Sequence, residues 1–268
     1  MGLRIQNNVE AFNTHRQLTA TSTAAAKSME KLSSGYRINR AADDAAGLAI
    51  SEKLRAQIGG LDQAGRNVSD AVSLVQTAEG QLNEVHSMLQ RVRELAVQYK
   101  NGTLSTEDRT AIQSEVNQLG SEIQRIGTAA AFNGISLLAN AGTITFQVGA
   151  NDGDSIAVST ISLGSAVSSG VFDLSAAGTT DISEIDDAIN QVSAQRSTFG
   201  AVQNRLEHTA NNLSVYQENL TASESQIRDV DMASEMVQFT KDQILQQAGT
   251  SMLSQANQLP NSVLSLLR

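Results

Sequence analysis

The sequence predicts a mainly α protein: an elongated helical bundle or coiled-coil rod, formed by the N- and C-terminal segments, with a small β-hairpin insert. Two observations predict this fold class. Apolar residues recur at alternating steps of three and four over long stretches, and a helix brings such positions onto one face. Aromatic residues make up only 3% of the 268 residues, which favours thin helical packing over a compact core built on bulky side chains.

The longest apolar seam predicts a helix within residues 41–101. It takes nine consecutive steps, through Val68, Ala71, Val75, Ala78, Leu82, Val85, Leu89, Val92, Ala96 and Tyr99. A shorter seam predicts the next helix, through Ile112, Val116, Leu119, Ile123 and Ile126. Many seam residues are small, and burial stabilises by only about 25 cal/mol per Å² of apolar area. We therefore expect a bundle of several helices, not a free two-stranded coil.

The two ends of the chain carry further seams. After an interruption at Arg196, a long returning helix is predicted through Phe199, Val202, Leu206, Thr209, Leu213, Tyr216, Leu220, Ser223, Ile227 and Val230. The terminal helix follows, through Leu245, Gly249, Met252, Ala256, Leu259, Val263 and Leu266. At the front, Ile5, Val9 and Phe12 precede a weaker seam that ends at Leu32.

Breaks between the predicted helices are marked by turn and capping residues. The Ser33-Ser34-Gly35 segment interrupts the first helix, and Gly59-Gly60 is expected to weaken or kink the second. Asn101-Gly102 closes the long helix. Ser105 and Asp108 have the spacing of a capping box, which opens the next helix.

The middle of the chain changes to a β pattern within an insert at about 141–180. Ile144, Phe146 and Val148 alternate with polar residues, a turn follows at Asn151-Asp152-Gly153, and alternation resumes at Ile156. This pattern predicts a β-hairpin. Residues 159–180 are rich in Ser, Gly, Ala and Thr and are expected to be loosely structured, with helix resuming near Asp181.

Charge is distributed unevenly around a net value of −9. Residues 1–40 carry +4, residues 41–240 carry −14, and no charged residue lies between Gln243 and Leu267. The acidic balance disfavours binding to nucleic acid or to an anionic membrane. No apolar run reaches the roughly 18–20 residues of a membrane span, and the first residues lack the apolar stretch of a secretory signal.

The sequence contains little that would support catalysis or metal binding. There is no Cys, and His15, His86 and His208 lie on predicted helices without clustered carboxylates or serines, so no general acid–base site is expected. The run 151–154 lacks most of a calcium loop's ligand pattern, and a turn between strands explains it. We expect no enzyme activity, cofactor or metal. The Asp43-Asp44 pair is interpreted as the start of a helix, with Arg40 balancing its charge.

The uncharged tail, 243–267, suggests burial among other chains. A solvated helix keeps charges on its outer face, whereas this one offers only Gln, Asn, Ser and Thr, which can be buried in hydrogen bonds at lower cost than ions. Alone, one thin seam gains too little to offset the entropy of ordering. Packed against copies of itself and the N-terminal helix, the tail would fold. The sequence thus predicts folding coupled to self-assembly.

Several motifs resemble the signatures of bacterial flagellins, over about 1–140 and 183–268. They are FNTHR (12–16), SMEKLSSGYRINR (28–40), DDAAGLAI (43–50), GAVQNRL (200–206), IRDVDMA (227–233) and VLSLLR (263–268). The resemblance implies a secreted structural subunit of the extracellular flagellar filament, which serves swimming motility. It assigns 1–40 with 231–268 to a terminal, inner-tube domain and 41–230 to a rod, outer-tube domain.

The resemblance also implies partners and contact residues. The chain would leave the cell unfolded through the flagellar type III apparatus, and a secretion chaperone, a filament cap and hook-junction proteins would act on it. Self-assembly is expected through the apolar positions of both ends: Ile5, Val9, Phe12, Leu245, Met252, Leu259, Val263 and Leu266. A Toll-like receptor of animal hosts senses many flagellins, and the matching positions here are Arg91, Leu95 and Glu115.

Two other functions are weighed against a filament subunit. A hook–filament junction protein has ends that resemble those of flagellin, but the match through 200–232 and the short middle favour flagellin. A secreted coiled-coil effector or adhesin would not require both termini to match one family.

Overall fold

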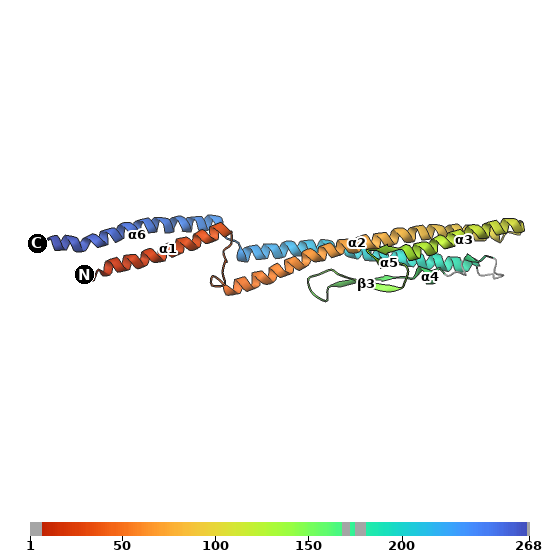
Figure 1. The fold of residues 1–268 in the computed structure, drawn as a ribbon, viewed down its shortest axis with the longest axis horizontal. Helices are drawn as coiled ribbons and strands as arrows, with labels where there is room; N and C mark the ends of the chain where they lie inside the picture. Colours follow the sequence, from red (N-terminus) through yellow and green to blue (C-terminus); the bar gives the residue numbers. More distant parts are fainter. Residues whose placement is uncertain (1–6, 168–171, 175–180, 267–268) are drawn as a thin grey trace. The chain divides into compact units, whose positions relative to one another are not determined.

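A computed structural model describes residues 7–167, 172–174 and 181–266, with the side-chain surroundings of Asp181 and 259–266 left out. The predicted fold class is confirmed: long helices dominate, and a small hairpin interrupts them (Figure 1). The helices are α1 Val9–Ser34, α2 Ala45–Tyr99, α3 Thr106–Ala129, α4 Leu163–Ala166, α5 Asp181–Arg228 and α6 Met232–Leu266. The strands are β1 Ala131–Phe132, β2 Ile135–Ser136, β3 Gly142–Gln147 and β4 Ser155–Thr160.

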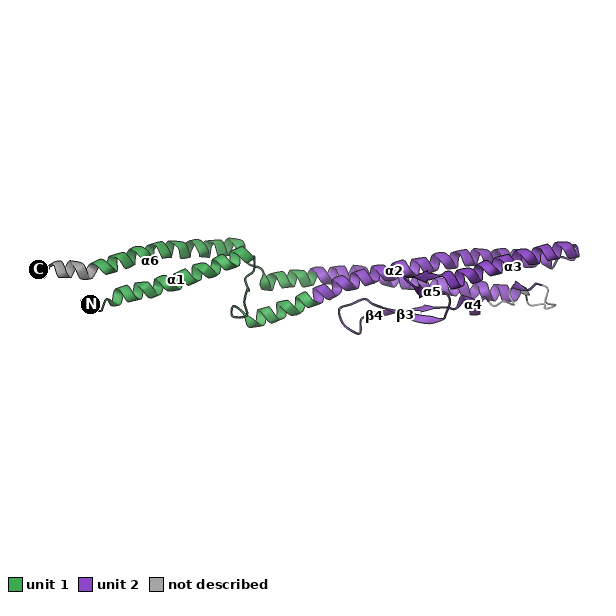
Figure 2. Ribbon diagram, in the orientation of Figure 1, with its two compact units in different colours: residues 1–56, 219–268 green, residues 57–218 purple. Residues whose placement is uncertain are grey.

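The chain divides into two compact units, coloured separately in Figure 2. Unit 1 combines residues 1–56 with 219–268, and unit 2 contains residues 57–218. Unit 1 therefore takes in both chain ends together with the first residues of α2 and the last residues of α5. The proposed division of roles at 40/41 and 230/231 concerns the filament and stays a prediction.

The core of unit 2 is the predicted seam of α2 packed against α3 and α5. Every seam position from Val68 to Ala96 is buried, as are Ile112, Val116 and Ile123 of α3. On α5, the seam does not stop at Arg196. It continues at steps of three and four through Ile185, Ala188, Val192, Gln195 and Phe199. Gln195 is a polar residue in an apolar seam, and its amide Nε2 donates to the carbonyl oxygen of Ser159 at 2.7 Å.

The predicted hairpin is present, as β3 and β4 pair antiparallel with Ile144 opposite Val158. In its turn, the Asp154 carboxylate accepts hydrogen bonds from the backbone and side-chain nitrogens of Asn151. Ala150 of this turn packs so close to α2 that a Cβ on Gly60 would lie 2.9 Å from it. Helix α2 runs unbroken through Gly59-Gly60, so Gly60 serves close approach of the hairpin and does not end the helix.

A second hairpin, with strands of two residues each, was not predicted. Strands β1 and β2 pair across Asn133 and Gly134, which both have positive φ values, 46° and 79°. An Asn-Gly pair is the usual sequence of such a tight turn, so the sequence did carry a signal for this hairpin.

Residues 159–180 are also more ordered than expected where described, since β4 extends to Thr160 and α4 follows. Residues 168–171 and 175–180 lie outside the described part.

The predicted helix ends are confirmed, with one correction. Gly35 ends α1 in the left-handed conformation, and the Ser105–Asp108 capping box opens α3. The Asp44 carboxylate accepts a hydrogen bond from the amide of Gly47 at 2.9 Å, and so caps the start of α2. The expected role of Arg40 is wrong: its guanidinium forms a two-pronged ion pair with Glu30 of α1, at 2.9 and 3.1 Å.

Within unit 1, α1 and α6 lie side by side and antiparallel (Figure 1). Three contacts set their register. Lys31 near the end of α1 lies 3.7 Å from the Glu235 carboxylate at the start of α6. Leu18 contacts Gly249, where a Cβ would lie 3.3 Å from the leucine Cδ1, and the Asn8 amide donates to the carbonyl oxygen of Ala256 at 2.8 Å.

Candidate assembly surface

The α1/α6 pair has an unusual distribution of polarity. The residues buried between its helices are polar or small and include Thr21, Ser28, Asp242 and Ala256. Many of its large apolar side chains, in contrast, are exposed, whereas Leu18, Leu32, Phe239 and Leu253 are half-buried. The exposed ones are Val9, Phe12, Met29, Met232, Met236, Val237, Ile244, Leu245 and Met252. Phe12 is 70% exposed. The pair therefore leaves much apolar surface in water, and an excess of exposed apolar surface is typical of an interaction site.

The sequence-predicted assembly residues fall on this surface where they are described. Val9, Phe12, Leu245 and Met252 are all exposed. Ile5 lies outside the described residues. Leu259, Val263 and Leu266 belong to α6, but their side chains are outside the description.

Helix α6 has one face that packs against α1 and another that is exposed, and the predicted seam contributes residues to both. The face toward α1 repeats every seven residues, through Glu235, Asp242, Gly249 and Ala256. Gly249 and Ala256 of the predicted seam belong to this face, whereas Leu245 and Met252 are turned outward. The periodicity of apolar residues predicts this face only in part, because Asp242 is charged and does not belong to an apolar seam.

Apolar side chains occur all round α6, so the predicted seam contains only part of them. Ile244 follows Asp242 by two residues, which at 3.6 residues per turn puts it on roughly the opposite side of the helix. Val237 and Met236 are also exposed outside the predicted seam. A helix that is apolar on every side is normally buried on every side. Within unit 1, α1 covers one side of α6.

The two connections of unit 1 are held together at Arg228, a site that the sequence did not indicate. Its guanidinium lies over the Tyr36 ring, 4.7 Å from the centroid, and donates to the Glu52 carboxylate at 2.8 Å. This hydrogen bond holds the pKa of Glu52 below its usual value. The backbone joins as well: the Arg37 amide donates to the Arg228 carbonyl oxygen at 2.7 Å, and the Val230 amide donates to the Gly35 carbonyl oxygen at 3.0 Å.

The receptor candidates in unit 2 differ in accessibility. Arg91 and Glu115 form an exposed ion pair at 2.9 Å that bridges α2 and α3. The hydrogen bonds that Arg91 donates to the carboxylates of Glu115 and Glu94 raise the pKa of its guanidinium. Leu95 is only 2% exposed and packs in the core, so it offers no contact surface in the isolated subunit.

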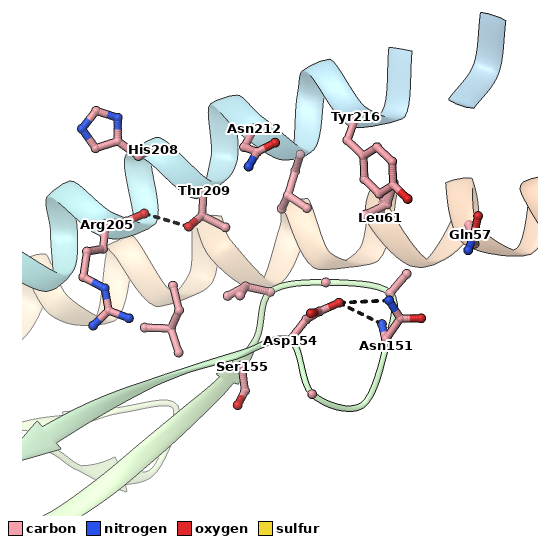
Figure 3. A pocket seen from close by; sticks show the side chains of 16 residues that line it. Gln57, Leu61, Asn151, Asp154, Ser155, Arg205, His208, Thr209, Asn212 and Tyr216 are labelled. Carbon is pink, nitrogen blue, oxygen red and sulfur yellow. Dashed lines mark hydrogen bonds between the residues drawn. The ribbon is translucent and has the colours of Figure 1, made fainter. Parts of the chain in front are cut away.

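A pocket of 570 Å³ lies in unit 2, between the hairpin turn and helices α2 and α5. Figure 3 shows Asp154 hydrogen-bonded to Asn151 at its edge and His208 pointing away from the turn. The Thr209 hydroxyl donates to the Arg205 carbonyl oxygen. Because the Asp154 carboxylate is engaged in shaping the turn and His208 is directed elsewhere, the pocket does not assemble an acid–base pair.

The described residues contain no group of three or more His, Asp or Glu side chains placed to hold a metal ion. None of the described helices has a stretch that is both long and apolar enough to cross a membrane.

The fold and this surface define a class: a helical protein whose two chain ends pair and present apolar side chains outward. Residues 5–143 match the bacterial flagellin N-terminal helical region, and residues 182–267 match the bacterial flagellin C-terminal helical region. The chain belongs to the bacterial flagellin family.

Known relatives are similar over nearly the whole chain. The flagellin of Bacillus subtilis strain 168 is 49% identical over 99% of this chain and 100% of its own length. The flagellin of Halalkalibacterium halodurans is 52% identical over 98% and 99%, respectively. Among solved structures, Bacillus cereus flagellin is 34% identical, with a TM-score of 0.52 over 55% of this chain and 88% of that chain.

Proposed function

We propose that this protein is the structural subunit of a bacterial flagellar filament and polymerises by burying the exposed apolar side chains of α1 and α6 between sister subunits. The observation that carries the proposal is the inverted polarity of the α1/α6 pair, with Asp242 inside and Phe12 outside. Family membership supports the same function, since the relatives with similar ends are named flagellins and flagellar filament core proteins.

The energetics favour assembly over the isolated pair. Between α1 and α6, Gly249 and Ala256 bury little apolar area, and the larger apolar residues Leu18, Leu32, Phe239 and Leu253 are only half-buried. At about 25 cal/mol per Å², contacts of this size hardly offset the entropy of ordering two helices. The outward side chains of Val9, Phe12, Leu245 and Met252 represent apolar area that only other molecules can bury.

The proposed roles of the two regions come from the family resemblance. Residues 1–40 and 231–268 would line the inner tube, and residues 41–230 would form the outer tube. Ile5, Leu259, Val263 and Leu266 would extend the same apolar contacts to the chain ends. The function is structural, without catalysis or a cofactor.

The route to the filament is proposed from the family resemblance. A secretion chaperone would bind the chain before export, and the flagellar type III apparatus would export it unfolded. Assembly would take place beneath the filament cap, with hook-junction proteins at the base of the filament. The filament would then be extracellular. A thin α1/α6 seam suits this route, because a pair that depends on its neighbours need not be unfolded at great cost before export.

Sensing by a host Toll-like receptor is a further proposed role of the rod. The exposed Arg91 and Glu115 are the remaining contact candidates, whereas the buried Leu95 would support their helix from inside. Replacing Arg91 or Glu115 by Ala should lower receptor signalling in a reporter cell line, and Leu95→Ala should act through rod stability.

Seeded polymerisation tests the main proposal. Purified subunits mixed with filament seeds should give long tubes of uniform diameter by negative-stain microscopy; a coiled-coil effector would give none, and a junction protein would not extend them. Met252→Asp should prevent growth, because a charge would be buried at a subunit contact. Met252→Leu is the matched control and should polymerise normally. Growth of Met252→Asp filaments at the normal rate would contradict the proposal.

Truncation gives an independent check. Removing 243–268 should leave a soluble helical protein that does not polymerise, since it loses Leu245, Met252 and the rest of the uncharged helix. Filaments from the truncated chain would show that the assembly surface lies elsewhere.

A further inference from the structure

Methionine is concentrated on the apolar surface of the α1/α6 pair. Among the described residues, Met29, Met232, Met236 and Met252 are exposed, and all four belong to unit 1. Met88 is the exception: it packs against the core of unit 2. The exposed thioethers thus lie where the proposed function needs apolar surface.

We propose that these four methionines are oxidation sites that make polymerisation of the subunit sensitive to peroxide and reversible by reduction. The inference rests on the proposed function, because it assigns the oxidation to the surface that subunits bury against each other. Its chemistry needs an oxidant of the peroxide class, such as hydrogen peroxide, and an exposed thioether sulfur.

The reaction balances without help from other protein groups. The thioether sulfur attacks one oxygen of the peroxide, the O–O bond breaks, and an S–O bond forms. The sulfur is oxidised by two electrons to the sulfoxide, and the peroxide is reduced to water. The product replaces a flexible apolar side chain by a polar one, which disrupts methionine-rich interfaces.

The positions of the four side chains determine the consequence. Met232 and Met236 are one turn apart on α6, and Met252 lies on another side of the same helix, beside Leu245. Met29 is on α1. Because these side chains point in different directions, their sulfoxides would affect several subunit contacts at once. Each contact would then bury an S–O group without a designed hydrogen-bond donor, which opposes association.

Reactivity should also depend on the state of assembly. In the free subunit, the four methionine side chains are exposed. In a filament that buries this surface, they would be shielded, whereas the surroundings of Met88 within unit 2 would not change. Oxidation should therefore act on subunits before they assemble, and assembled filaments should resist it.

The first experiment compares the intact chain with a variant that carries Met29→Leu, Met232→Leu, Met236→Leu and Met252→Leu. Leu preserves volume and apolar character and cannot form a sulfoxide. Both proteins are treated with hydrogen peroxide, freed of it and mixed with seeds. Oxidation should raise the critical concentration of the intact chain at least about tenfold and leave the variant unchanged. Treatment with methionine sulfoxide reductases for both epimers and a dithiol should restore assembly.

Each other outcome is decisive. Normal polymerisation of intact chains with sulfoxide at all four sites overturns the inference and leaves the proposed function standing. Equal inactivation of the leucine variant also overturns it, because the damage then lies elsewhere. If untreated intact chains do not extend seeds, the proposed function fails, and this inference fails with it.

A second measurement does not depend on the variant. Mass spectrometry of peptides from peroxide-treated free subunits and filaments should show Met29, Met232, Met236 and Met252 oxidised at least about fivefold more slowly in filaments, with Met88 reacting equally in both. Equal rates for the four residues in the two states would overturn the inference.

Discussion

The buried carboxylate of Asp242 accepts hydrogen bonds from the side-chain amide of Gln238, one turn earlier on α6, at 3.3 Å to each oxygen. Asp242 is only 4% exposed and lies on the face that packs against α1. The nearest ion pair in this seam is between Lys31 and Glu235, two turns away on α6. A carboxylate buried with only long amide hydrogen bonds weakens the pairing of two helices.

Replacing Asp242 by Asn should therefore stabilise the α1/α6 pair, by on the order of 1 kcal/mol. Asn keeps the shape and can still accept from Gln238, but it has no charge to desolvate. Hydrogen exchange of the α1 and α6 amides should slow about fivefold at that magnitude. Glu235→Gln is the matched control, because it removes a carboxylate that pairs with Lys31, and exchange should be unchanged or faster. Equal slowing in both variants would contradict the role of burial.

Replacing Arg228 by Lys should loosen the joint between the two connections of unit 1. Lys keeps the charge but loses the planar group that stacks on Tyr36 and the fixed hydrogen bond to Glu52, at a cost of about 0.5–2 kcal/mol. The amides of Arg37 and Val230, which form hydrogen bonds across this joint, should exchange faster. Arg205→Lys, at an exposed position of α5 in unit 2, should leave them unchanged. Unaltered exchange in the Arg228 variant would show that the backbone contacts suffice.

Acid should loosen the same joint. The pKa of Glu52 is lowered by its hydrogen bond from Arg228, and the pKa of Asp43 is lowered by the backbone amide of Arg40. A carboxylate with a lowered pKa in the folded state contributes stability above its unfolded value, and this contribution is lost as the pH falls through the folded value.

We therefore expect the segment 35–44 to lose exchange protection progressively below about pH 4.5, where unfolded Glu begins to take up protons. After correction for intrinsic exchange rates, Arg228→Gln should show less of this pH dependence than the intact chain, since Glu52 then loses its partner at every pH. An identical profile in both proteins would rule out Glu52 as a source of the effect.

Two helical glycines should respond oppositely to alanine. Apart from the backbone of its own helix, nothing lies within 4 Å of a Cβ added to Gly80 of α2, so Gly80→Ala should stabilise unit 2 by about 0.5–1 kcal/mol through helix propensity. A Cβ on Gly120 of α3 would lie 2.7–3.0 Å from ring carbons of Phe172. Gly120→Ala should destabilise by about 1–3 kcal/mol, because the ring must shift in a packed core. Urea denaturation measures both, and equal effects would contradict the packing of Phe172.

Much of the fold was predictable because helix seams, caps and hairpins have local causes. The seam from Val68 to Ala96 is buried as predicted, and Ser105 with Asp108 caps α3. Gln195 shows where the same reasoning stops. A hydropathy pattern does not predict Gln at a core position. The side-chain amide of Gln195 can be buried there because it donates a hydrogen bond to the carbonyl oxygen of Ser159. The error at Arg40 is similar, since its partner Glu30 belongs to another helix and competes with the nearby Asp43-Asp44.

The assembly surface divides in the same way. The sequence by itself determined that both ends form helices with apolar seams and that the C-terminal end has no charge between Gln243 and Leu267, because composition and periodicity belong to the chain alone. Only the tertiary structure decided which side of α6 meets α1. That choice depends on the small size of Gly249 and Ala256, which lets the two backbones approach, and it leaves Leu245 and Met252 facing outward for other subunits to bury.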